Sequence, residues 1–264
     1  MPWVTKLNLD LTGRIAIVTG ASRRQGIGAA ICRALVDQGA EIFFTHWQPY
    51  DQTQSHGADA EGPEALLAAL RQRGRRAESL EIDLSQVDAA DRILDAVHAR
   101  LGPPAILVNN AAHSTQDGYE RLDAAMLDAH YAVNVRAMAL LSVGFARRYS
   151  GGSGGRIVNL SSGQSQGPMP DELAYIASKG AIEAFTLSLS AGVASKGITV
   201  NAVNPGPTDT GWMTNDLKAA LLPKMGLGRI GSPDDAARLV AFLASDAAEW
   251  ITGQVIHSEG GFLR

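Results

Sequence analysis

The sequence is poor in the residues and patterns that mark several classes of protein. It has one cysteine, Cys32, which excludes an intrachain disulfide and fits a reducing cytosol. It has no HExxH or CxxC motif, so we expect no catalytic metal. It has no apolar run long enough to cross a bilayer, and its first residues, "MPWVTKLNLDLTG", contain no signal-peptide core. These absences predict a cytoplasmic protein without a membrane segment.

An excess of charge of one sign is also absent. The 23 basic and 27 acidic residues give a formal net charge of −4, and there is no long basic run. The densest basic cluster, Arg71, Arg73, Arg75 and Arg76, is typical of a solvated helix end. We therefore expect no nucleic-acid partner.

What the sequence does have is a regular alternation of short apolar runs and longer helical patterns. Strands are predicted at 14–19, 41–45, 77–83, 105–111, 156–161, 198–203 and 254–259. Helices are predicted near 27–38, 63–73, 86–100, 122–149, 174–195 and 233–245. This alternation predicts a doubly wound α/β fold, with a seven-stranded parallel sheet and helices on both faces. Since no linker or repeat divides the chain, residues 1–264 are expected to form a single domain.

Two irregular stretches interrupt this pattern. Residues 46–62 are polar and predict a long surface loop. Residues 205–232 are more apolar and include Trp212, Met213 and Leu217. A loop with that much apolar surface packs over something, so a substrate lid is favoured, with a subunit contact as the alternative.

The stretch "TGASRRQGIG" follows the first predicted strand and leads into the first predicted helix. Gly20, Gly26 and Gly28 would supply a tight turn and a close backbone approach. The N–H groups and the dipole at the start of the helix favour a bound pyrophosphate. The glycines indicate a cofactor site, and a purely structural turn is the alternative.

Two further patterns point to proton transfer. In "YIASK", Tyr175 and Lys179 are four residues apart and share a helix face, so the ammonium can lower the pKa of the phenol. In "RIVNLSS", Ser161 and Ser162 end a buried strand, where a hydroxyl can reach a ligand in the crevice of a parallel sheet. Taken singly, each pattern also fits an ordinary structural role.

Together, these motifs resemble those of the short-chain dehydrogenase/reductase family over nearly the whole chain. The shared motifs, in order, are "TGASRRQGIG", "EIDL", "LVNNAA", "YAVN", "IVNLSS", "YIASK", "NPGPTDT" and a terminal "GGF". The resemblance implies a Rossmann-type fold that binds a nicotinamide cofactor and transfers hydride to a carbonyl or from a secondary alcohol.

The resemblance also implies roles for single residues. Tyr175 would be the general acid and base, and Lys179 would lower its pKa and bind the nicotinamide ribose. Ser162 would hold the reacting oxygen, and Asn134 would support a water-linked proton relay to Lys179. The residues expected at the cofactor are Gly20, Ser22, Arg23, Arg24, Gly26, Ile27, Gly28, Asp83, Leu84, Asn110, Tyr175, Lys179, Pro205, Gly206, Thr208 and Thr210.

The sequence departs from the family pattern in the glycine loop. Gly20 and Gly26 are separated by five residues, where the family usually has three. A longer loop resembles the enoyl-acyl-carrier-protein reductases, but those place the lysine seven residues after the tyrosine. Here Lys179 follows Tyr175 by four, so the resemblance favours carbonyl and alcohol chemistry.

The end of the second predicted strand, "EIFFTHWQ", bears on the choice of cofactor. An acid there would bind the adenosine ribose and repel a 2′-phosphate, but none occurs before Asp51, and His46 stands in its place. Arg23 and Arg24 lie in the glycine loop, and a guanidinium matches phosphate bidentately. We therefore predict a preference for NADP(H) with Ser22 as a helper, and NAD(H) as the alternative. The arginines could instead be merely solvated.

The predicted function is that of a nicotinamide-dependent oxidoreductase acting on a small-molecule carbonyl or alcohol. A 3-oxoacyl thioester or another apolar ketone is the first expectation, because such reductases are common in the family. The alternatives are a sugar or polyol dehydrogenase and a non-catalytic nucleotide sensor. The resemblance further implies a homotetramer that associates through the predicted helices 122–149 and 174–195.

Overall fold

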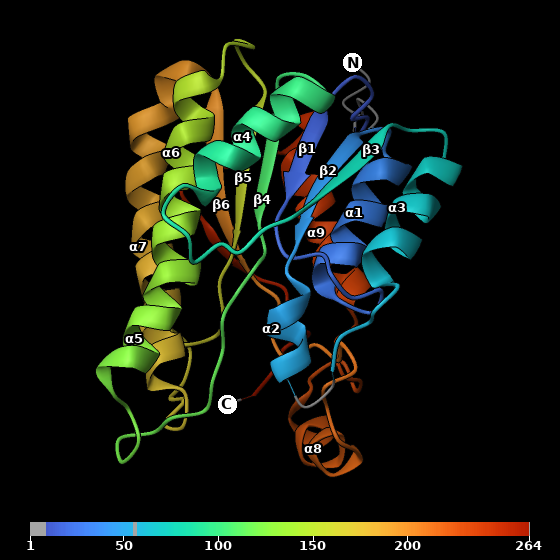
Figure 1. Ribbon diagram of the computed structural model, residues 1–264. Coiled ribbons are helices and arrows are strands. Elements are labelled where there is room, and N and C mark those ends of the chain that lie inside the picture. Colours follow the sequence, from blue (N-terminus) through green and yellow to red (C-terminus); the bar gives the residue numbers. More distant parts are fainter. Residues whose placement is uncertain (1–8, 55–56, 264) are drawn as a thin grey trace, which may run out of the picture.

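A seven-stranded sheet lies at the centre of the computed structural model, which describes residues 9–54 and 57–263. All its strands run parallel, in the order β3-β2-β1-β4-β5-β6-β7 (Figure 1). Their bounds are β1 Ile15–Val18, β2 Glu41–His46, β3 Ala77–Glu81, β4 Ile106–Asn109, β5 Gly155–Leu160, β6 Ile198–Asn204 and β7 Val255–His257. The predicted doubly wound sheet is confirmed. The strand order reverses between β1 and β4, which opens a crevice at the carboxyl ends of the strands.

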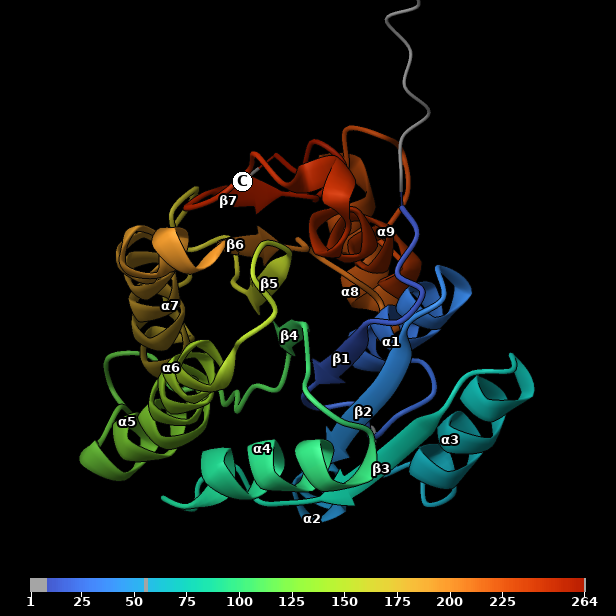
Figure 2. The ribbon, with the colours of Figure 1, turned by 90° about the horizontal axis from the view of Figure 1, so that it is seen from above.

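Helices cover both faces of this sheet (Figure 2). The main ones are α1 Ile27–Asp37, α3 Gly62–Gln72, α4 Ala89–Arg100, α5 Ala124–His130, α6 Met138–Arg148, α7 Leu173–Val193 and α9 Pro233–Ala244. One apolar cluster lies between the strands and α1, α3 and α9, and a second lies between the strands and α4, α6 and α7. In β1, Ile15 and Ile17 join the second cluster while Ala16 and Val18 join the first. Such alternation explains why the strand is apolar throughout.

The prediction of a long surface loop at 46–62 is wrong. His46 ends β2, residues Gln48–Thr53 form α2, and α3 begins at Gly62. The side chain of Asp51 in α2 is buried against the glycine loop, 3.9 Å from the Arg23 guanidinium. A polar six-residue helix carries no apolar periodicity, so contacts made by the folded chain define it. Residues 55 and 56 of the predicted loop lie outside the described residues.

The predicted helix 122–149 is continuous but not regular. A π-helical segment, Tyr131–Ala137, joins α5 to α6 and contains Asn134. π-helical turns occur mainly at functional sites, because they alter the direction in which side chains leave the helix.

Residues 205–232 leave the sheet at its carboxyl edge and return to it. An isolated bridge pairs Thr208 with Gly231, and α8, Asn215–Leu221, lies between them (Figure 1). Met213 and Met225 are buried, while Trp212 is 46% exposed. The stretch therefore buries part of its apolar surface and is closed at its base. Among the described residues, no helix is long and apolar enough to span a membrane.

Candidate active site

The glycine loop packs tightly against the segment that follows β4. Gly20 has φ +73°, and a Cβ there would lie 2.6 Å from the Ala111 Cα. A Cβ on Gly28 would lie 2.4 Å from the Gly20 carbonyl oxygen. The Asn110 amide donates to the carbonyls of Thr19 and Gly20 at 2.9 and 2.8 Å. Asn110, predicted at the cofactor, thus also holds the shape of the loop.

The start of α1 is suited to a bound phosphate. Gly26 is its N-cap and makes no side-chain cap bond, and the first turn has no acidic residue. The N–H groups at Ile27 and Gly28 therefore meet no carboxylate of their own helix. An anion approaching over Gly26 would accept from them and gain from the helix dipole. The residues present fit the pyrophosphate of a dinucleotide.

The two arginines of the loop are held by different partners. The Arg23 guanidinium donates to the carbonyl and hydroxyl oxygens of Thr210, at 3.0 and 3.2 Å, and lies near Asp51. Arg24 forms a two-bond pair with Asp59, at 2.7 and 3.0 Å. Both side chains therefore have partners within the protein, whereas the alternative interpretation expected them to be solvated only.

Two orphaned polar atoms lie near this loop. The Nδ1 of His46 and the Oδ2 of Asp51 are buried, and neither has a hydrogen-bond partner among the described residues. Both belong to the end of β2 or to α2, the region in which the sequence predicts the adenosine ribose to bind. A ribose hydroxyl there could donate to the Asp51 oxygen or bond the His46 nitrogen, which also fits a dinucleotide.

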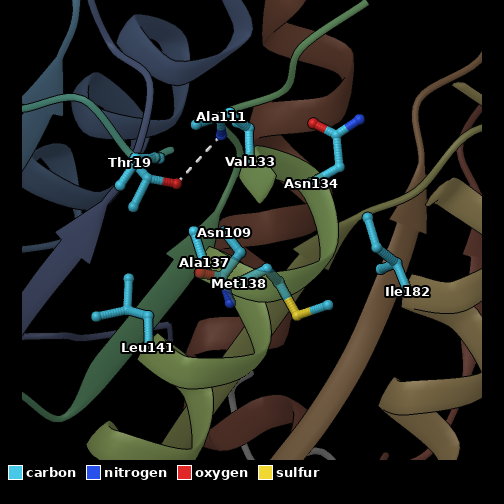
Figure 3. A pocket seen from close by; sticks show the side chains of 10 residues that line it. Thr19, Asn109, Ala111, Val133, Asn134, Ala137, Met138, Leu141 and Ile182 are labelled. Atoms are coloured by element: carbon cyan, nitrogen blue, oxygen red, sulfur yellow. Dashed lines mark hydrogen bonds between the residues drawn. The ribbon is translucent and has the colours of Figure 1, made fainter. Parts of the chain in front are cut away.

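Asp83 and Leu84 follow β3 and have separate environments. The Asp83 carboxylate accepts from the backbone N–H and the hydroxyl of Ser85, both at 2.8 Å, and this closes a turn. Leu84 lines a small pocket together with Thr19 and Asn134, between the carboxyl end of β1 and the π-helical segment (Figure 3). The structure therefore places predicted adenine and relay residues around one space.

Tyr175 and Lys179 lie one turn apart on α7, facing the end of β5. The Lys179 ammonium donates to the Leu160 carbonyl at 2.7 Å and lies 5.4 Å from the centre of the Tyr175 ring. Burial lowers the pKa of Lys179 to about 8. Burial and the charge of Glu172 raise the pKa of Tyr175, while a hydrogen bond with Ser162 opposes them. The phenol is thus neutral at pH 7.

The two serines at the end of β5 differ in their contacts. The Ser161 hydroxyl is buried and donates to the Glu183 carboxylate at 2.6 Å. The Ser162 hydroxyl bonds the Tyr175 phenol. Of the two serines, Ser162 therefore contacts the tyrosine, and its role at the reacting oxygen stays a prediction.

Asn134 connects the loop after β4 to α7. Its side-chain oxygen accepts from the His113 N–H at 2.7 Å, and its amide donates to the His113 carbonyl and the Ser178 hydroxyl, both at 2.9 Å. The side chain reaches the residue next to Lys179. A water-linked route from Asn134 to Lys179 stays a prediction.

The "NPGPTDT" segment forms the base of the 205–232 excursion. Gly206 has φ +63°, and a Cβ there would lie 2.3 Å from the Glu259 Cβ. The Thr208 hydroxyl donates to the carbonyls of Pro205 and Gly206, both at 3.2 Å. Thr210 accepts the bonds from Arg23, so the glycine loop and this segment are joined.

A row of aromatic rings beside Tyr175 was not predicted. The His130 ring lies 6.4 Å from the Tyr175 ring and 4.7 Å from that of His113, and Tyr50 of α2 lies 5.3 Å beyond. Burial, together with His130, lowers the pKa of His113 and keeps it neutral. The only sequence signal was the position of His113 directly after "NNAA". Among the described residues, no group of His, Cys, Asp and Glu could hold a metal.

Comparisons with known proteins agree with this geometry. The family model described as "Enoyl-(Acyl carrier protein) reductase" matches residues 20–263. An uncharacterized oxidoreductase of Bacillus subtilis (strain 168), YjdA, is 55% identical over 95% of this chain and 97% of its own. The 3-oxoacyl-[acyl-carrier-protein] reductase FabG of Pseudomonas aeruginosa is 34% identical over 96% of this chain and 98% of its own.

A solved structure gives the same result. A short-chain dehydrogenase from Burkholderia cenocepacia J2315, in complex with NADP, superposes with a TM-score of 0.85 at 34% identity. The match covers 95% of this chain and 98% of that one. The predicted family is confirmed: this protein is an oxidoreductase that belongs to the short-chain dehydrogenase/reductase family.

Proposed function

We propose that this protein is an NADP(H)-dependent oxidoreductase that interconverts a carbonyl and a secondary alcohol. The observation that carries the proposal is the meeting of Ser162, Tyr175 and Lys179 at the end of β5. The bound nicotinamide would supply or accept the hydride. Its pyrophosphate would lie over Gly26 at the start of α1, and its ribose near Lys179.

The side chains would share the proton chemistry. The Ser162 hydroxyl would hold the substrate oxygen against the Tyr175 phenol. Because that phenol is protonated at neutral pH, it can donate its proton to the oxygen as the carbonyl is reduced. Lys179, with a pKa of about 8, is mostly charged at pH 7 and stabilises the resulting phenolate. In the oxidative direction the same proton returns to Tyr175.

An acyl thioester or another apolar ketone is the substrate class we propose first. The FabG relative is named for 3-oxoacyl reduction, and the 205–232 excursion carries apolar side chains such as Trp212. The four-residue Tyr175–Lys179 spacing favours carbonyl over enoyl reduction.

A sugar or polyol is the second candidate, because polar groups also flank Tyr175. His113 lies beyond His130 in the row of rings beside Tyr175, and Glu172, half-buried, has its pKa raised by burial and by Asp117 and Asp171. Such groups could bind the hydroxyls of a polar substrate.

We also propose that the chain works as one domain in the cytoplasm. The two apolar clusters pack on opposite faces of one sheet, which supports a single domain. The free, buried Cys32 fits a reducing compartment.

The test is the oxidation of reduced cofactor in the presence of activated ketones, acyl thioesters and sugars. Tyr175→Phe should lower kcat by about 10²–10⁴-fold, because only the transferred proton is lost. Ser162→Ala should lower it by about 10²-fold, while the matched Ser161→Ala should change it little. A Tyr175→Phe variant with nearly normal kcat, or the reverse ranking of the serines, would contradict the proposal.

A further inference from the structure

We propose that Asp117 is a positioning residue for Tyr175, an inference that rests on the role proposed above for that tyrosine. Asp117 lies in the connection between β4 and α5, outside the helix that carries Tyr175. Its carboxylate accepts from the N–H groups of Leu173 and Ala174, at 2.7 and 2.8 Å. These are the residues immediately before Tyr175, so a distant loop holds the turn from which the phenol projects.

The start of α7 has no other cap. Glu172 occupies the N-cap position and makes no side-chain cap bond, and the first turn contains no acidic residue. A helix start leaves N–H groups without partners, and here they are in the interior beside a site that must stay ordered. Asp117 is 2% exposed and supplies these partners from outside the helix. A carboxylate there also gains from the helix dipole.

Asp117 itself is held in place by hydrogen bonds to its backbone and its side chain. The Asp117 N–H donates to the Asp171 carbonyl at 2.8 Å, and the Gly118 N–H donates back to the Asp117 carboxylate. The Arg121 side chain donates to the Asp117 carbonyl at 3.0 Å. Gly118 and Arg121 thus hold the aspartate within its own loop, and Asp171 ties that loop to the segment just before α7, so the loop can set the position of the helix start.

Loss of this contact should act on Tyr175 in particular. Lys179 is held separately by the Leu160 carbonyl, one turn further along, and Ser162 belongs to β5. A frayed first turn would move the phenol relative to both, while the glycine loop that should bind the cofactor stays in place. A misplacement of about 1 Å can lower a rate by about 10²-fold.

The experiment compares Asp117→Ala and Asp117→Asn with a matched control, Asp123→Ala. Asp123 caps α5 by accepting from the Met126 N–H at 2.8 Å, so its loss removes the cap of a helix that does not carry Tyr175. For each purified variant, kcat is measured with the best ketone substrate. The dissociation constant of reduced cofactor is measured by fluorescence, and Tm by thermal unfolding.

We expect Asp117→Ala to lower kcat by about 10²-fold with the cofactor dissociation constant within about twofold of the parent. Asp117→Asn keeps one acceptor and should recover about tenfold of that loss. Asp123→Ala should lower Tm but leave kcat unchanged. Near-parental kcat in Asp117→Ala, or an equal kcat loss in Asp123→Ala, would overturn the inference.

Two further outcomes keep the test decisive. If Asp117→Ala does not fold, Asp117→Asn decides, and a kcat within twofold of the parent overturns the inference. If Tyr175→Phe is fully active, the proposed function itself fails. If Tyr175→Phe is inactive while both Asp117 variants are normal, only the role of Asp117 fails.

Discussion

Lys179 is a charged side chain in a buried position. It is 2% exposed, and its hydrogen bond to the Leu160 carbonyl does not replace the water that it loses. Burial therefore lowers its pKa from 10.5 to about 8. The lysine that should activate Tyr175 thus destabilises the fold at neutral pH, as is common for residues held at a functional site.

Replacement by methionine should make the protein more stable and less active. The unfolded chain binds the Lys179 proton up to pH 10.5, and the folded chain releases it from about pH 8. Below pH 8 the charged lysine costs up to about 3 kcal/mol of unfolding free energy, and this cost fades as the pH rises toward 10.5. Lys179→Met should therefore raise the free energy of unfolding at pH 7, although loss of the hydrogen bond to Leu160 offsets part of the gain. At pH 10 the gain should be smaller.

Urea unfolding of the cofactor-free protein at pH 7 and pH 10 measures this difference. Lys196→Met serves as the control, because Lys196 lies at the end of α7, away from Tyr175. A gain for Lys179→Met that is the same at both pH values, or a loss of stability at pH 7, would show that burial of the charge is not the cause.

At the residue scale, the sequence could identify residue types but not their partners. The sequence alone does not distinguish Ser161 from Ser162, and the second was selected only because it matches the family pattern. The structure supplies the physical reason, since Glu183 takes the first hydroxyl. Asp117 and His113 carried no comparable signal, because their contacts form only after β4 and α7 have come together.

At the element scale, the sheet and its main helices could be predicted because their apolar periodicity records which face is buried. α2 could not be, since Tyr50 and Asp51 stabilise it through contacts with Ser114 and Arg23 that are distant in sequence. The π-helical segment at Asn134 also left no signal, because seven residues are too few to show a period of their own.

The glycine loop should determine the choice of cofactor. The Arg24 side chain is 58% exposed in its pair with Asp59, and exposed pairs contribute little, so Arg24 can exchange Asp59 for a 2′-phosphate. Arg23 is held more firmly by Thr210 and should contribute less. We expect the parent to prefer NADPH, and Arg24→Ala to lower the ratio of kcat/KM for NADPH over NADH by about tenfold or more.

The control for this prediction is Arg73→Ala, which removes a similar pair with Asp37, at 2.8 Å, on the surface of α3. Steady-state kinetics with both cofactors give the ratio for each variant. A parent that prefers NADH would refute the proposed binding of a 2′-phosphate by these arginines. A parent that prefers NADPH, with neither Arg23→Ala nor Arg24→Ala altering the ratio, would assign the selectivity to the segment after β2.

At the scale of the whole molecule, one layer of helices carries exposed apolar side chains. Leu127, Tyr131 and Leu140 are exposed along α5, the π-helical segment and α6, and Leu187 is exposed on α7. Apolar side chains gathered on neighbouring helices suit a self-complementary contact between copies. We therefore still expect the homotetramer that the family resemblance implies, associating through these helices.

Introduction of a charge into this surface should divide the assembly. Leu187→Glu would bury carboxylates at the expected contact, so light scattering at micromolar concentration should give a smaller species than the parent protein does. Val87→Glu is the control, because Val87 is 74% exposed but lies between β3 and α4. A monomeric parent, or an assembly unchanged by Leu187→Glu, would contradict the proposed interface.

The bridge between Thr208 and Gly231 has a consequence for how such a protein can diversify. Because the two ends of the excursion stand side by side, residues 211–222, which lie before the contacts of residues 224–227 with the C-terminal segment, can be lengthened, shortened or transplanted from a relative without stretching β6 or displacing α9. This part of the chain can therefore be exchanged while the sheet and its helices stay the same. Substrate range could then drift, or be engineered, while the machinery for hydride transfer is inherited intact.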